Sequence, residues 1–120
     1  MQKFNFSYDR ENDDLFLFSP GSKSKGSVEM GDLILDYNSK KELVGLQIMK
    51  ASKMLREMTG GKSRDLVSEV LNNLKECKVD IRVKNNLLIV KVYLSSKANE
   101  ISPVISVPSI REPSPALAYA

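Results

Sequence analysis

Residues 78–95, KVDIRVKNNLLIVKVYLS, contain two runs whose alternation is typical of a β-hairpin. In the first run, three apolar residues between Val79 and Val83 alternate with charged residues, so the apolar side chains share one face of a strand. Asn85 and Asn86 follow, and asparagine tolerates the left-handed backbone of a tight two-residue turn. The stretch therefore predicts an antiparallel hairpin.

The second strand of this hairpin, residues 87–95, is apolar on both faces. A strand of this kind lies in the centre of a sheet or is buried in a contact with another chain. From the second alternative we expect a homodimer, as a hypothesis that light scattering checks.

Two short helices are predicted before the hairpin. Apolar residues recur at helical intervals over residues 51–58, where Ser52 is the expected N-cap and Gly60 the expected end. A second helix is expected to begin at Ser63, which can cap it, with Asp65 favourably placed in the first turn. Its apolar stripe consists of Leu66, Val67, Val70, Leu71 and Leu74.

The N-terminal half predicts two further pairs of hairpin strands. Alternating residues around the polar turn at residues 9–14 indicate one pair, and the stretches VEMGDLILDY and LVGLQIMK, within residues 28–50, indicate the other. The predicted fold class is α+β, with an antiparallel sheet of about seven strands and both helices packed on one face. The helix that begins near Ser63 is the best cover for the apolar face.

A change of composition separates the end of the chain from the domain. We predict one α+β domain over residues 1–94, in which residues 59–94 add a helix and a hairpin to residues 1–58. Residues 95–120 contain four of the five prolines and are expected to form an extended or disordered tail. Because the tail is more apolar than a spacer needs to be, we expect it to order on a protein partner or, alternatively, to pair as a strand within a dimer.

The net charge of +3 is unevenly distributed. Residues 1–36 carry a net −3, residues 37–97 a net +7 and residues 98–120 a net −1. Candidate nucleic-acid contacts are the basic residues of the predicted C-terminal hairpin, Lys78, Arg82, Lys84 and Lys91. Since basic residues are interspersed and no aromatic ladder accompanies them, a solvated surface is the favoured interpretation and nucleic-acid binding the alternative.

Acidic residues gather in the first predicted turn. Asp9, Glu11 and Asp13 are candidate ligands of calcium or magnesium, but the turn lacks the glycine and the final glutamate of a helix-loop-helix calcium site. Turn chemistry is therefore the favoured explanation. The sequence contains no histidine, which removes the usual general base, and we expect no catalytic set, no cofactor and no enzyme activity.

Gly61, Lys62 and Ser63 are the last three residues of a phosphate-binding loop motif, but Arg56 stands where the motif requires its first glycine. The segment before them is also predicted as a helix rather than a strand. We therefore interpret the glycines as the end of one helix and Ser63 as the cap of the next.

No apolar run reaches the roughly 18 residues needed to cross a membrane, and the N-terminus lacks the apolar stretch of a secretory signal. The single cysteine, Cys77, cannot form an internal disulfide and is interpreted as a buried bystander. These features predict a cytoplasmic protein without a membrane contact.

Two blocks within residues 4–58 resemble a small prokaryotic family called domain of unknown function 2283. The first block, YDRENDDLFL, is similar to the family's opening through Tyr8, Asp9, Glu11, Asp13 and Leu15. The second block, residues 33–52, is similar through Ile34, Leu35, Asp36, Val44, Gly45, Ile48, Ala51 and Ser52. The chain departs from the family pattern at Lys41, Gln47 and Lys50, where the family often has glycine or acidic residues.

The resemblance implies an uncharacterised small domain that acts by binding a partner, in an antitoxin-like or regulatory role, rather than by catalysis. The leading hypothesis is therefore a non-enzymatic interaction protein. Nucleic-acid binding through the basic face and small-ligand or metal binding at the acidic turn are the alternatives.

Overall fold

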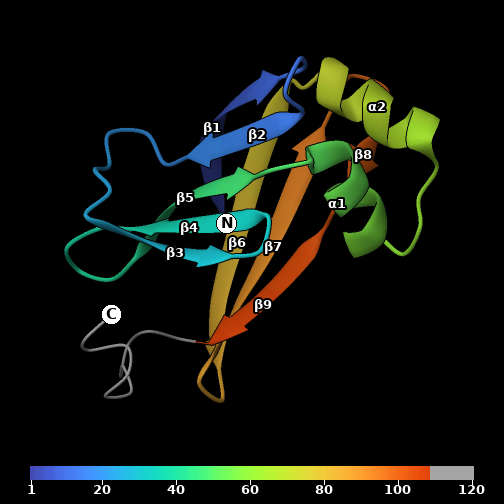
Figure 1. Cartoon of the computed structure of the whole chain (residues 1–120). Coiled ribbons are helices and arrows are strands. Elements are labelled where there is room, and N and C mark those ends of the chain that lie inside the picture. The colour runs from blue at the N-terminus through green and yellow to red at the C-terminus, as the bar shows by residue number, and fades with distance from the viewer. Residues whose placement is uncertain (109–120) are drawn as a thin grey trace.

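The computed structural model describes residues 1–108 and contains two helices and a nine-stranded antiparallel sheet (Figure 1). The N-terminal strands are β1 (Gln2–Asp9), β2 (Asp14–Phe18), β3 (Gly26–Met30), β4 (Leu33–Tyr37) and β5 (Leu43–Ile48). The helices are α1 (Ala51–Met58) and α2 (Arg64–Asn72). The C-terminal strands are β6 (Glu76–Lys84), β7 (Leu87–Ser95), β8 (Glu100–Ile101) and β9 (Val104–Pro108).

The sheet curls because β1 changes its partner along its length. Residues 2–4 pair with β6, whereas residues 5–9 pair with β2. The strand order is β3-β4-β5-β2-β1-β6-β7-β8, and β9 also pairs with β7. Strands β2 to β5 cross over β6, β7 and β9, so the two halves of the sheet face each other (Figure 1).

The core lies between these two halves. Phe4, where β1 changes partner, is 2% exposed, and Leu35 and Leu46 of the N-terminal half are fully buried, as are Val90 and Val92 of the C-terminal half. Alternation in each strand supplies this apolar surface, and burying it is the main favourable term in the folding free energy.

Both helices lie on the same side of the curled sheet (Figure 1). Helix α2 contacts β7 and β8 and buries Val67, Val70 and Leu71 in the core. Ser63 caps this helix as predicted, because its Oγ accepts a hydrogen bond of 3.1 Å from the Leu66 N–H. The α+β fold class is confirmed. The sequence predicted that helices would cover the apolar face of the sheet, but in the structure the other half of the sheet covers much of that face.

The predicted C-terminal hairpin is confirmed as β6 and β7. Asn85 and Asn86 have φ values of 51° and 63°, the left-handed conformation expected for its turn. Strand β7 lies between β6 and β9, so the central position that its apolar character allowed is confirmed. That position accounts for the strand without a second chain, and the homodimer stays a prediction.

The sheet extends beyond residue 94, where the sequence placed the end of the domain. Strands β8 and β9 both pair with β7, and Ile101, Ile105 and Val107 are buried. Proline is tolerated here because β9 is an edge strand and because Pro103 uses its carbonyl, which accepts a hydrogen bond of 2.9 Å from the Val92 N–H. The boundary at residue 94 is therefore wrong for residues 100–108, while the rest of the predicted tail, residues 109–120, lies outside the described residues.

Within residues 1–108, no helix is long and apolar enough to cross a membrane.

The two faces of β9 make its place in the core testable. We expect Ile105→Ala, which removes a side chain that is 5% exposed, to lower the free energy of unfolding by about 2–4 kcal/mol. The neighbouring Val104→Ala is the matched control, since Val104 is 47% exposed and the expected change is within about 0.5 kcal/mol. Urea unfolding measures both values, and equal effects of the two substitutions would contradict the pairing of β9 with β7.

Candidate functional site

The four predicted basic residues lie on one face of the sheet. Strand β6 turns Lys78, Arg82 and Lys84 outward, because they alternate with the inward-facing Val79 and its neighbours. In β7, Lys91 stands opposite Asp80 and therefore projects from the same side. We call this outward side of β6, β7 and β9 the basic face.

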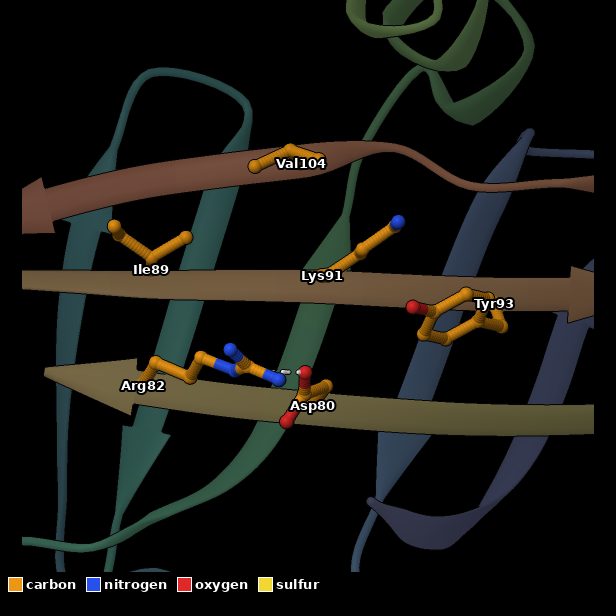
Figure 2. Close-up of a pocket in the computed structure, with 6 residues that line it drawn as sticks. All are labelled: Asp80, Arg82, Ile89, Lys91, Tyr93 and Val104. Atoms are coloured by element: carbon orange, nitrogen blue, oxygen red, sulfur yellow. Dashed lines mark hydrogen bonds and ion pairs between the residues drawn. The ribbon is translucent and has the colours of Figure 1, made fainter.

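The basic face also holds side chains that were not named from the sequence. Tyr93 stands opposite Lys78, and Ile89 stands opposite Arg82. Val104 of β9 stands opposite Lys91. Together with Asp80, Arg82 and Lys91 they line a shallow depression of about 290 Å³, in which side chains of three neighbouring strands converge (Figure 2).

Sequence analysis missed Val104 because residues 95–120 were assigned to a tail. A signal was present in this segment, since Ile101, Pro103, Ile105 and Val107 alternate with outward residues and are all buried. The prolines outweighed that alternation.

Part of the charge on the basic face is compensated locally. Arg82 Nε lies 3.1 Å from Asp80 Oδ2, and Lys78 Nζ lies 2.9 Å from Glu76 Oε1. The Lys78 ammonium lowers the pKa of Glu76, and Glu76 in turn raises the pKa of Lys78. Ion pairs this exposed contribute little to stability, so a partner can replace them at small cost.

Lys91 is held differently. Its Nζ lies 5.0 Å from the centroid of the Tyr93 ring, a cation–π contact that leaves the ammonium without a carboxylate partner among residues 1–108. Lys84, beside the hairpin turn, also makes no ion pair in this part of the chain. These two lysines are the cations best placed to contact an acidic ligand.

The acidic turn has a structural role that the sequence did not predict. Asp13 has a φ of 57°, which directs its carboxylate toward the start of α1. That carboxylate accepts hydrogen bonds from the Ser52 N–H at 3.1 Å, from the Ser52 hydroxyl at 2.6 Å and from the Tyr8 hydroxyl at 2.6 Å. Burial, and then the hydrogen bond to Asp13, raise the pKa of Tyr8 above its ordinary value.

The predicted N-cap of α1 is therefore wrong. Lys50 occupies the cap position in a left-handed conformation, and its side chain makes no capping hydrogen bond. Asp13, in the turn between β1 and β2, instead accepts a hydrogen bond from the Ser52 N–H. Sequence analysis missed this arrangement because the two residues are 39 positions apart.

The three weak metal candidates are not brought together. Asp9 accepts hydrogen bonds from the side chain and the backbone N–H of Asn12, which lower the pKa of its carboxyl, whereas Asp13 faces α1. Glu11 lies exposed in the turn between them. Within residues 1–108, no group of three or more acidic, histidine or cysteine side chains is arranged to hold a metal ion.

Cys77 is buried as predicted. The residue is 0% exposed, and burial raises the pKa of its thiol to about 12. The side chain is therefore protonated at neutral pH and serves as part of the core.

The role of Asp13 can be separated from a metal role. Asp13→Asn keeps a residue that tolerates the left-handed conformation but removes the carboxylate, and we expect it to lower the free energy of unfolding by about 1–2 kcal/mol. Glu11→Gln, in the same turn, is the control and should change it by less than about 0.5 kcal/mol. Thermal melts with calcium and with EDTA complete the test, because a calcium-dependent melting temperature that is lost in Asp13→Asn would contradict the capping role.

Comparisons with known proteins match part of the chain to a family of unknown function. Residues 5–52 match the model of a family described as protein of unknown function (DUF2283). The chain is 28% identical over 101 residues to an uncharacterized protein of Methanocaldococcus jannaschii, a match that covers 82% of this chain and 80% of that protein. It is 24% identical over 94 residues to a putative hypoxanthine phosphoribosyltransferase of Methanosarcina mazei, covering 77% of this chain and 69% of that protein.

No solved structure matches the chain. The family match begins within β1, includes β2 to β5 and ends in α1 at Ser52, the residue that hydrogen-bonds to Asp13. The resemblance predicted from the two sequence blocks is therefore confirmed, and residues 5–52 of this chain match the DUF2283 family of proteins of unknown function.

Proposed function

We propose that this chain is a non-enzymatic interaction protein that binds an acidic protein partner on its basic face. The observation that carries the proposal is the gathering of cationic and apolar side chains from β6, β7 and β9 on one open side of the sheet (Figure 2). Complementary charge of this kind directs association and selects the partner.

The composition of the basic face favours a protein as the partner. Leu87 and Val104 are 43% and 47% exposed, and they lie among cations instead of being scattered singly. Arginine and tyrosine, here Arg82 and Tyr93, are enriched in protein interfaces, where apolar contact supplies affinity and charge supplies specificity. Antitoxin-like or regulatory binding is one form of this proposal.

Nucleic-acid binding is the second candidate. It is supported by the four cations, which come from two neighbouring strands and share a face with Tyr93. Against it, the Tyr93 ring is occupied by Lys91 rather than open for base stacking.

Two further points belong to the proposal. The activity named for the Methanosarcina mazei relative stays with that protein, because the identity is 24% and the basic face is an open surface.

We place the chain in the cytoplasm, a compartment that suits the buried and reduced thiol of Cys77.

Site-specific photo-crosslinking in the native cell tests the proposal. With a photoreactive amino acid at Val104, we expect a covalent adduct that protease digests and nuclease leaves intact. Adding Lys84→Gln and Lys91→Gln should reduce the adduct about tenfold or more, because each charge-assisted contact contributes roughly 1.5–3 kcal/mol at most.

The control carries the photoreactive residue at Glu29, on the outward side of β3 in the other half of the sheet. An adduct of equal yield at Glu29 would show random collision and reject the basic face as the site. An adduct that nuclease digests would reject the protein partner in favour of nucleic acid.

The homodimer is a separate prediction. We expect light scattering at micromolar concentration to give twice the mass of the chain, with Val83 and Leu87, which flank the turn of the β6–β7 hairpin, in the contact, since both are more than 40% exposed. Val83→Ser combined with Leu87→Ser should then give a monomer. A monomer for the unsubstituted chain would end the hypothesis.

A further inference from the structure

A second basic depression, of about 240 Å³, lies where α1 ends and the chain turns toward α2. It is lined by Lys53, Arg56, Glu57, Gly61 and Lys62. These residues are separate from the basic face, and the proposed function makes no use of them.

Helical spacing and a tight reversal bring these side chains together. Lys53 precedes Arg56 by three positions and Glu57 by four, which places all three on one side of α1. Gly60 and Gly61 have φ values of 76° and 82°, and the Gly61 N–H donates a hydrogen bond of 2.8 Å to the Arg56 carbonyl oxygen. The chain therefore folds back on the last turn of α1, and Lys62 joins the same depression.

The depression has an excess of positive charge with no internal partner. Three cations line it against the single carboxylate of Glu57, and within residues 1–108 none of the three takes part in an ion pair. The Arg56 Nε is buried and has no hydrogen-bond acceptor in this part of the chain. Leaving a charged donor unsatisfied costs free energy, and a bound anion toward which the Arg56 side chain can turn would recover that cost.

We propose that this depression binds a phosphate group, either free inorganic phosphate or the phosphate of a nucleoside monophosphate. A doubly charged phosphate matches the excess of cations better than a carboxylate does, and the guanidinium of Arg56 can donate two parallel hydrogen bonds to it. The site differs from a phosphate-binding loop, because side chains rather than a wrapped backbone hold the anion and because the Ser63 hydroxyl is used as a helix cap.

Titration with sodium phosphate, followed through backbone amide chemical shifts in nitrogen–proton NMR spectra, tests this site. We expect saturable shifts at Gly60 and Gly61, while sodium chloride at the same ionic strength gives none that saturate. Arg56→Gln and Lys62→Gln should each weaken binding about tenfold, because each removes a charge-assisted contact. Glu57→Gln should tighten binding several-fold, since it removes the competing carboxylate.

The matched control is Lys40→Gln, which removes an exposed lysine from the β4–β5 turn and should leave phosphate binding unchanged. Should Arg56→Gln fail to fold, Lys62→Gln carries the test, because Lys62 lies exposed between the helices. Shifts that do not saturate, or that Lys62→Gln leaves unaltered, would overturn the site.

A second arm with adenosine 5′-monophosphate identifies the source of the phosphate. Tighter binding than inorganic phosphate, with shifts at the same glycines, assigns the site to a nucleotide, and equal binding assigns it to the phosphate group alone. Lys84→Gln with Lys91→Gln should leave both titrations unchanged, so a failure of the basic face and a failure of this site are distinguishable.

Discussion

The structure depends on the change of partner along β1. Because residues 2–4 pair with β6 and residues 5–9 with β2, one strand belongs to both halves of the sheet and turns their apolar faces toward each other. Phe4 is buried at the point of change. Without this arrangement each half would present an open apolar face, and two short helices could not cover both.

That arrangement also leaves an outward face on each half of the sheet. In a strand, every second side chain points away from the core. The side chains that lie between the buried valines of β6 and β7 therefore do not take part in core packing. In the C-terminal half these positions hold Lys78, Arg82, Lys84 and Lys91. The same periodicity that builds the core therefore places four of the chain's 18 basic residues on one open surface, beside the carboxylates of Glu76 and Asp80.

Features set by neighbouring residues were predictable from the sequence, and features set by distant residues were not. The Asn85–Asn86 turn and the Ser63 cap involve contacts within a few positions, so their residue types are diagnostic. The cap of α1 by Asp13 joins residues 39 positions apart, and β9, in the proline-rich end of the chain, pairs with β7 residues that lie more than ten positions before it. The basic face was predicted by residue type, but its apolar members depend on that same edge strand.

The family match itself describes structure more than function. The hydrogen bonds between Asp13 and Ser52 join the β1–β2 turn to α1. At position 45 a side-chain carbon would lie 2.9 Å from an oxygen of Asp36, so glycine leaves room for that carboxylate. Both arrangements lie inside residues 5–52, whereas the basic face is built from β6, β7 and β9, and the proposed phosphate site from residues 53–62. The segment that matches the family thus forms most of the N-terminal half of the curled sheet. The chemistry proposed for this chain depends instead on the segment after Ser52, so function should be sought there.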